Sequence, residues 1–387
     1  MESSSAVTEL QKKTENLKVA LVHDWLVSQR GGENVLDAFC EILPHAHVYT
    51  LVHKKNSTAE HIERAVPRTS LLQKIPGIEK IYRYFLPLMP LVIESIDLSS
   101  YDLILSSSHC VAKGVQKKPG AKHVCYIHAP MRYMWDRFDE YFSKGRAAFH
   151  TRMVAKIFRP YLQWWDLKSA KGVDVFIANS RFIAEKVKQY YKRDAFVVHP
   201  FCEFEKFQKR KKPATEQGSP EPYFLIVTAL VPYKRVDLAI EAFNRSGDAL
   251  YIVGDGPDLE KLKAMAKSNI YFLGAAKNEE LVDLYQKSKG LIFPGIEDFG
   301  IVPLEAMACG VPVLAYGEGG ATETVIARET GLFFSEPTVD SLLKVLSRFQ
   351  ETPFQPEKCI QRASQFTRKQ FQEKIAQRIL DSIFHIS

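Results

Sequence analysis

Two carboxylates, Glu297 and Glu305, flank a short loop in the segment GIEDFGIVPLEAMACGVPVLAYGEGGATETV, residues 295–325. The apolar run 291–294 before them predicts a buried parallel strand, and Pro303 suits the first turn of a helix. Glu305 in that turn can accept hydrogen bonds from both hydroxyls of a ribose, although acidic residues there often only complement the helix dipole. Glu297, at the strand end, would lie nearer a reacting group. Strand, loop and helix together predict a nucleotide site at the carboxyl edge of a parallel sheet.

The start of this helix also offers backbone donors to an anion, because the first N–H groups of a helix have no partner within it. A second apolar run, 311–316, leads into the glycine-rich turn 317–320. Both loops should therefore lie at one edge of the sheet, and the N–H groups expected to face an anion are those of Phe299, Gly300 and Ile301.

Two cations precede a predicted helix in the same half of the chain. Lys234 and Arg235 follow a predicted strand, 223–228, and Pro232. Lysine can act as a point charge on a diphosphate, and arginine can form a bidentate fork. They could instead be solvated residues of a first helical turn, but cations are slightly unfavourable at a helix N-terminus. That cost favours a role in binding an anionic leaving group.

A glycine pair follows the first predicted strand, 18–23, and precedes a predicted helix, 33–42. Gly31 and Gly32 allow a ligand to approach the backbone closely and leave N–H groups for an oxyanion. The alternative is an ordinary tight turn.

Short apolar runs alternate with helical patterns along both halves of the chain, as in doubly wound parallel sheets. Between 201 and 222 the composition becomes polar, charged and proline-containing, which marks the best domain boundary. We predict an α/β protein with a flexible leader 1–17, an N-terminal domain 18–204, a linker 205–222, a C-terminal domain 223–365 and a final helical segment 366–387.

The composition is that of a globular protein with two cores, at 387 residues and 46% hydrophobic. No apolar run approaches the ~20 residues of a membrane span, and residues 1–18 lack the apolar core of a signal peptide. The cysteines are scattered without a C-x-x-C pair, which indicates free thiols in a reducing cytosol. We expect neither a structural metal nor a cofactor.

The chain is basic, with a net charge of +7. The cluster 144–171 mixes Arg and Lys with aromatic residues at helical spacing, and 81–96 adds a second apolar-aromatic stretch. The first is either a core helix with a solvated basic face or an interfacial helix that meets anionic lipid. We expect a cytoplasmic protein, and the interfacial helix would make it peripheral at the inner face of the membrane. Nucleic acid is less expected, because no binding motif accompanies the charge.

The sequence resembles the family 4 glycosyltransferases, which are retaining enzymes of the GT-B fold. E-D-F-G-I-V-P-L-E-A is similar to the family's E-x7-E motif. Other segments resemble the family in the family's order: VHDWL…RGGEN (22–34), YIHAPMRYMWD (126–136), NSRF (179–182), VVHP (197–200), VPYKRVDLAIEAF (231–243) and VGDGP (253–257). HAPMRYMWD is most similar to the mannosyltransferase-like branch that builds bacterial surface polysaccharides.

The resemblance implies two Rossmann-like doubly wound domains facing a central cleft, with the last part of the chain crossing back to the N-terminal domain. It implies a nucleotide-sugar donor, with GDP-mannose favoured, and a lipid-linked or saccharide acceptor. Gly31 and Gly32 would lie between acceptor and donor phosphate, and Glu297 with His128 beside the transferred sugar. The acceptor side could be lined by Arg132, Trp135 and Asp136, which follow His128 at suitable spacings, although Trp135 could simply be a core residue.

Two observations qualify this resemblance. Ala229 stands where many relatives carry an arginine, so one expected diphosphate contact is missing, and Arg235 could compensate. No D-x-D motif occurs, which is consistent with cations and helix N-termini, rather than a metal, holding the diphosphate.

Two other functions fit two Rossmann-like halves. A dinucleotide-dependent oxidoreductase would need the G-x-G-x-x-G spacing, which the first glycine turn lacks. A non-catalytic relative would keep the fold, but Glu297, Glu305, Lys234 and His128 are all present.

Overall fold

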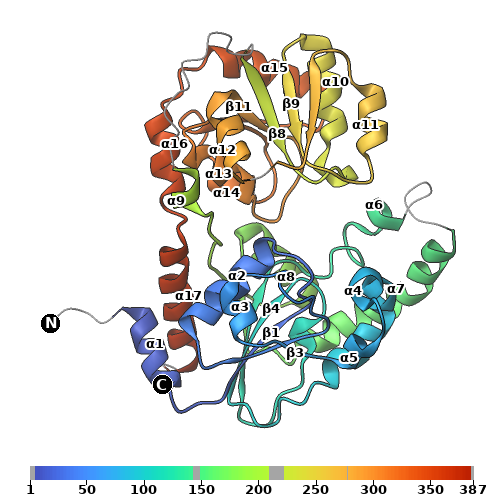
Figure 1. Ribbon diagram of the computed structural model, residues 1–387, viewed down its shortest axis with the longest axis vertical. Coiled ribbons are helices and arrows are strands. Elements are labelled where there is room, and N and C mark those ends of the chain that lie inside the picture. Colours follow the sequence, from blue (N-terminus) through green and yellow to red (C-terminus); the bar gives the residue numbers. More distant parts are fainter. Residues whose placement is uncertain (1–4, 143–148, 209–221, 277, 385–387) are drawn as a thin grey trace. The chain divides into compact units, whose positions relative to one another are not determined.

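The computed structural model describes residues 5–142, 149–208, 222–276 and 278–384. The chain divides into two compact units: unit 1 is Met1–His199 with Lys369–Ser387, and unit 2 is Pro200–Arg368. Each unit is a parallel sheet with helices on its faces (Figure 1).

Unit 1 contains a seven-stranded parallel sheet in the order β3-β2-β1-β4-β5-β6-β7. The order reverses between β1 and β4, where a doubly wound sheet opens a crevice at its carboxyl edge. All residues of β1 and β4 are buried, because helices cover both faces. The strands are β1 (Val19–His23), β2 (His47–Thr50), β3 (Arg68–Thr69), β4 (Leu103–Ser108), β5 (Lys122–Ile127), β6 (Val175–Ala178) and β7 (Phe196–Val197).

The helices of unit 1 are mostly short, apart from two long ones, α7 and α17. The α-helices are α1 (Ala6–Thr14), α2 (Gly31–Ile42), α3 (Glu60–Arg64), α4 (Ile78–Ile81), α5 (Met89–Glu94), α6 (Phe138–Phe142), α7 (Phe149–Ala170), α8 (Arg181–Tyr191) and α17 (Arg368–Ile383). The 3-10 helices are η1 (Leu71–Lys74), η2 (Tyr82–Leu88) and η3 (Ala112–Gly114).

Unit 2 repeats the plan with a six-stranded parallel sheet in the order β10-β9-β8-β11-β12-β13. Its order reverses between β8 and β11. The strands are β8 (Tyr223–Val227), β9 (Leu250–Val253), β10 (Ile270–Gly274), β11 (Ser288–Phe293), β12 (Val313–Tyr316) and β13 (Gly331–Phe334). The helices are α9 (Phe204–Phe207), η4 (Pro232–Lys234), α10 (Val236–Ser246), α11 (Leu259–Met265), α12 (Asn278–Lys287), α13 (Ile301–Ala308), α14 (Ala321–Thr324), α15 (Val339–Glu351) and α16 (Pro356–Ala363).

The sheet of unit 2 is covered on both faces. Neighbouring residues of one strand enter different cores: Leu225 and Leu291 belong to one buried cluster, and Phe224 and Ile292 to another. Successive side chains of a strand point to opposite faces, so these clusters are the two layers between sheet and helices. This double burial explains why the strands read as continuous apolar runs.

The N-terminal segment differs from the flexible leader expected from the sequence. Residues 6–14 form helix α1, in which the Ser5 side chain caps the N-terminus by accepting from the backbone N–H of Thr8. Leu10 is fully buried, and the Ala6 N–H donates to Glu373 of α17 at 2.9 Å. The polar composition of this segment does not predict the helix, because the residues that it packs against lie at the other end of the sequence.

The C-terminal helix belongs to unit 1. In α17, Phe371 stacks on Phe39 of α2 with ring centroids 5.9 Å apart. Gln372 donates to Glu41 of α2 at 2.8 Å. Most of the predicted linker, residues 209–221, lies outside the described residues.

Candidate functional site

In unit 2, the predicted nucleotide loop lies between β11 and α13. Helix α13 begins at Ile301, and Gly300 before it has a φ of +90°, a conformation that favours glycine. Gly300 has no side chain with which to cap the helix, so backbone N–H groups define this helix start. Phe299, Gly300 and Ile301 therefore lie where the sequence places them, at the N-terminus of α13.

The glycine loop after β12 packs directly on this nucleotide loop. A Cβ atom on Gly320 would come within 2.1 Å of the Cα of Phe299, and one on Gly319 within 2.6 Å of the carbonyl oxygen of Glu297. The N–H of Gly320 donates to that same carbonyl at 2.8 Å. Glycine is therefore required at both positions, because only it permits this backbone approach.

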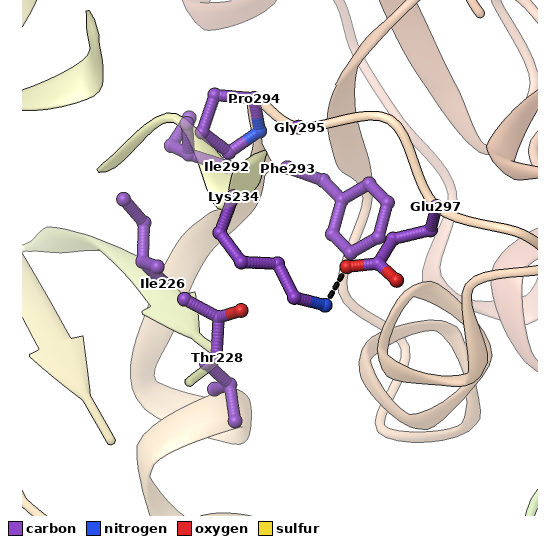
Figure 2. Close-up of a pocket in the computed structure, with 9 residues that line it drawn as sticks. Ile226, Thr228, Lys234, Ile292, Phe293, Pro294, Gly295 and Glu297 are labelled. Atoms are coloured by element: carbon purple, nitrogen blue, oxygen red, sulfur yellow. Dashed lines mark ion pairs between the residues drawn. The ribbon is translucent and has the colours of Figure 1, made fainter. Parts of the chain in front are cut away.

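A pocket opens at the carboxyl edge of β8 and β11, where the strand order of unit 2 reverses. Figure 2 shows Lys234 and Glu297 pointing toward one another across it, and the Lys234 ammonium forms an ion pair with the Glu297 carboxylate. Their side chains are only 18% and 15% exposed. The pocket is lined by Ile226, Val227, Thr228, Lys234, Ile292, Phe293, Pro294, Gly295 and Glu297.

Arg235, the second predicted cation, is not among the residues that line this pocket. Its φ is +52°, and it forms the N-cap of α10. Its guanidinium Nε donates to Asp237 at 3.3 Å. The structure thus directs Arg235 to its own helix, while Lys234 alone of the pair faces Glu297.

Glu305 lies one turn into α13, beside α12. The buried hydroxyl of Tyr285 donates to its Oε2 at 3.2 Å. Burial raises the pKa of Glu305 to about 7, even though the Tyr285 hydrogen bond and the charge of Lys206 both act to lower it. The carboxyl proposed for a ribose therefore titrates near neutrality.

In unit 1, polar residues gather where β1, β4 and β5 end. His23 and Ser107 are register partners on adjacent strands, and His128 follows β5. The Ser107 hydroxyl lies 2.8 Å from Nε2 of His128 and 3.1 Å from Nδ1 of His23. Burial, with the nearby charges of His109 and His23, holds the pKa of His128 well below its usual range, so its imidazole is neutral.

The glycine pair does not form a separate turn, because α2 begins at Gly31 and includes both glycines. A Cβ atom on Gly32 would lie 3.4 Å from Cε1 of His23 and 3.7 Å from Nε2 of His128. The first turn of α2 thus packs against the two histidine rings. Glu33 follows in the same turn, is 5% exposed, and places Oε1 3.9 Å from Nε2 of His23.

Asp24 is the main residue that the sequence analysis missed. It is fully buried and accepts from the four successive backbone N–H groups of residues 109–112, at 2.6 to 3.1 Å. The His109 ring contacts it at 3.0 Å. Burial opposes the charge of Asp24, but His109 and these hydrogen bonds outweigh it and lower the pKa of the carboxyl. The available signal was an acid directly after the first predicted strand.

The predicted acceptor-side residues divide. The indole of Trp135 donates to Asp166 at 2.8 Å and stacks on Tyr190, so it belongs to a buried network, as the alternative reading held. Asp136 pairs with Lys186 of α8 at the surface. Of the three predicted residues, Arg132 acts electrostatically on His128 and lowers its pKa. Across the residues that the structure describes, no group of three or more His, Cys, Asp or Glu side chains has the arrangement to hold a metal ion.

Two family models cover most of the chain. "Glycosyltransferase Family 4" matches residues 30–206, and "Glycosyl transferases group 1" matches residues 207–366.

Two curated relatives are mannosyltransferases. The α-1,3/1,6-mannosyltransferase ALG2 of Dictyostelium discoideum is 24% identical over 62% of this chain and 64% of its own length. The GDP-mannose-dependent α-(1-6)-phosphatidylinositol monomannoside mannosyltransferase of Mycolicibacterium smegmatis is 37% identical over 31% of this chain and 36% of its own. The matched region is thus less than two thirds of either relative.

Solved structures share the fold at low identity. HepE of Anabaena, determined with UDP, superimposes with a TM-score of 0.64 at 17% identity, covering 94% of this chain and 99% of HepE. Sucrose-phosphate synthase of Thermosynechococcus elongatus gives a TM-score of 0.67 at 19% identity, covering 96% of this chain and 100% of the synthase.

Proposed function

Because this chain belongs to the family 4 glycosyltransferases and has their GT-B fold, we propose that it is a retaining, metal-independent hexosyltransferase. The donor is a nucleotide sugar, with GDP-mannose favoured, and the acceptor is lipid-linked or a polysaccharide. The mannosyltransferase relatives support this donor. The proposal depends most on one observation, the Lys234–Glu297 ion pair in the pocket. The pocket lies beside the loop before α13, on which the glycine loop packs closely.

In this proposal each polar group of unit 2 has one role. Glu305 accepts the ribose hydroxyls, and Lys234 meets the diphosphate with the N–H groups at the start of α13. Lys234 exchanges Glu297 for the phosphate oxygens, which leaves the Glu297 carboxylate for the sugar. Lys234 then stabilises the negative charge that grows on the leaving nucleoside diphosphate.

In unit 1, His128 orients hydroxyls of the transferred sugar. Transfer with retention proceeds on one face of the sugar, where the acceptor oxygen bonds to the anomeric carbon as the bond to phosphate breaks. The leaving phosphate takes the proton of the acceptor hydroxyl. No covalent nucleophile is part of this proposal.

A lipid-linked acceptor is supported by the surface of α7. No helix within the described ranges is long and apolar enough to cross a membrane. Helix α7 nevertheless exposes Phe149, Ile157 and Trp164 by 75%, 66% and 58%, close to the exposed cations Lys156 and Lys168. Trp165 of α7 donates to Glu94 of α5 at 2.7 Å, which joins α7 to a neighbouring element that exposes Leu91. Such a basic apolar face suits anionic lipid at the cytoplasmic side of a membrane.

A thermal-shift screen tests the donor site. GDP, UDP, ADP, TDP and NAD are each added with EDTA, and one nucleoside diphosphate should raise Tm. Turnover of the corresponding nucleotide sugar, with the anomeric configuration of the product read by NMR, then tests retention. A response to NAD alone would replace the proposal by an oxidoreductase, and binding without turnover on any acceptor would indicate a non-catalytic relative.

Co-sedimentation tests the membrane contact separately. Vesicles with anionic phosphatidylglycerol should pellet the protein, and neutral phosphatidylcholine vesicles should pellet much less. The variant Ile157→Ser, which shortens an apolar side chain that is 66% exposed, should weaken binding, whereas Tyr271→Ser, at a 47% exposed position in unit 2, should not. Equal loss in both variants would contradict a docking role for α7.

A further inference from the structure

A chain of polar groups leads from the first turn of α2 to His128. Glu33 faces Nε2 of His23 at 3.9 Å, Nδ1 of His23 lies 3.1 Å from the Ser107 hydroxyl, and that hydroxyl lies 2.8 Å from Nε2 of His128. His23 and Ser107 are fully buried, and Glu33 nearly so. A serine hydroxyl has a single proton, so it can donate to only one of its two histidine neighbours.

The Glu33 end of this chain decides which way the protons point. Glu33 lies in the first turn of the twelve-residue helix α2, where the helix dipole favours a carboxylate. Among the described residues, Nε2 of His23 has no hydrogen-bond partner, and the Glu33 carboxylate lies 3.9 Å from it. A bare nitrogen lone pair there would repel the carboxylate. Nε2 of His23 therefore carries the proton.

The remaining bonds then have one consistent direction. When the His23 ring carries a single proton, at Nε2, its Nδ1 has a lone pair and accepts from the Ser107 hydroxyl. The Ser107 oxygen, having donated its proton, accepts from Nε2–H of His128. Neutral His128 then has its second proton site, Nδ1, empty. The reverse direction would place the lone pair of His23 against Glu33.

We propose that Glu33, His23 and Ser107 are positioning residues that fix the tautomer of His128, so that its Nδ1 accepts a hydrogen bond from a hydroxyl of the donor sugar. This inference rests on the proposed function, which places His128 beside that sugar. His128 acts on the substrate directly, and the other three act through it. The arrangement resembles the general use of an outer partner to set the tautomer of a working histidine.

Nitrogen-15 NMR of histidine-labelled enzyme tests the tautomer without any donor. In the free wild-type protein, His23 and His128 should both be protonated at Nε2 and bare at Nδ1. In Glu33→Leu, His23 should lose this preference. Protonation of His128 at Nδ1 in the wild type would overturn the proposal.

Binding measurements test the contact with the sugar. Calorimetry with GDP-mannose and with GDP compares Ser107→Ala with the control Ser106→Ala, which removes an equivalent buried bond, from Ser106 to His123 at 2.8 Å. Ser107→Ala should lower the affinity for GDP-mannose about tenfold and leave the affinity for GDP unchanged. Ser106→Ala should change neither affinity. Equal affinities of wild type and Ser107→Ala for GDP-mannose would contradict the sugar contact.

A double variant tests whether the residues act in series. Glu33→Leu and Ser107→Ala should each lower the affinity for GDP-mannose. The double variant should bind GDP-mannose no more weakly than Ser107→Ala alone. Additive losses would overturn the chain. If wild type binds neither GDP-mannose nor GDP, the proposed donor fails, and the NMR result still decides the tautomer.

Discussion

Both units gather polar residues where their strand order reverses, at β1 and β4 in unit 1 and at β8 and β11 in unit 2. The two edges are built differently. The edge of unit 1 consists of buried side chains that hydrogen-bond to one another and to the backbone, such as Asp24 and Ser107. The edge of unit 2 consists of backbone held in place by glycines, with the Lys234–Glu297 ion pair facing the pocket. One fold thus prepares a site either through side-chain chemistry or through close approach of the backbone.

The same substitution in the two units should give the largest contrast. Gly320→Ala places a methyl group 2.1 Å from backbone atoms of Phe299, so the free energy of unfolding should fall by about 3 kcal/mol or more. Gly32→Ala meets only an ordinary contact at 3.4 Å within a helix, and its stability should change by at most about 1 kcal/mol. Urea unfolding of both variants measures this. Equal losses would show that unit 2 does not depend on backbone approach.

If the proposed function holds, Glu297→Gln should lower the rate of sugar transfer by about 100-fold or more, because it removes the charge that the proposal places beside the reacting sugar. Its free energy of unfolding should change by less than about 1 kcal/mol. Steady-state kinetics and urea unfolding give the two values. Glu318→Gln, at an exposed position of the glycine loop, is the control and should keep full activity. Retained activity in Glu297→Gln would remove this residue from the reaction.

Asp24→Asn should show the opposite profile, with a loss of about 2 kcal/mol in unfolding free energy. The asparagine retains the shape, but its amide group turns N–H donors toward the backbone N–H groups that the carboxylate accepts. Chemical denaturation is the measurement, with Asp237→Asn in unit 2, where the side chain is 36% exposed, as the control. A loss no greater than that of the control would mean that side-chain hydrogen bonds do not hold the edge of unit 1.

The smallest effect concerns pH. The pKa of Glu305 is raised to about 7, and in the proposed function its carboxylate accepts the ribose hydroxyls. The affinity for a nucleoside diphosphate should therefore increase as pH rises through 7, by at most about tenfold per pH unit. The stability of the fold should change in the opposite direction. Burial favours the neutral acid of Glu305, so its contribution to the free energy of unfolding is complete below the pKa of an exposed glutamate and is lost as pH rises through about 7. Calorimetry from pH 6 to 8 tests the affinity. Glu305→Gln should remove the dependence, and a 2′,3′-dideoxynucleoside diphosphate should not show it.

Much of the fold could be predicted from the sequence, because doubly buried strands read as apolar runs. The predicted strands 18–23 and 223–228 agree with β1 and β8, each to within one residue. The prediction was weaker wherever a distant segment decides the structure. Helix α1 is held by a hydrogen bond to Glu373, and the indole of Trp135 donates to the buried Asp166. Both partners lie far from these residues in the sequence.

The candidate site shows the same limit. The residues around Glu297 were found because loop, helix and glycines are adjacent in sequence. The chain from Glu33 to His128 was missed because Ser107 meets His23 only through the register of β1 with β4. The direction taken by Arg235 was also missed, because its positive φ cannot be read from residue type.

The placement of α17 has a consequence for how the protein is made. Unit 2 lies within unit 1 in the sequence, so its sheet and helices are all synthesised before residue 369. Unit 1 uses both α1, which precedes unit 2 in the sequence, and α17, which follows it. A nascent chain can therefore complete unit 2 first, while Phe39 and Tyr126 of unit 1 still await Phe371. Synthesis of α17, rather than of its own sheet, is therefore the event that completes unit 1 of this protein.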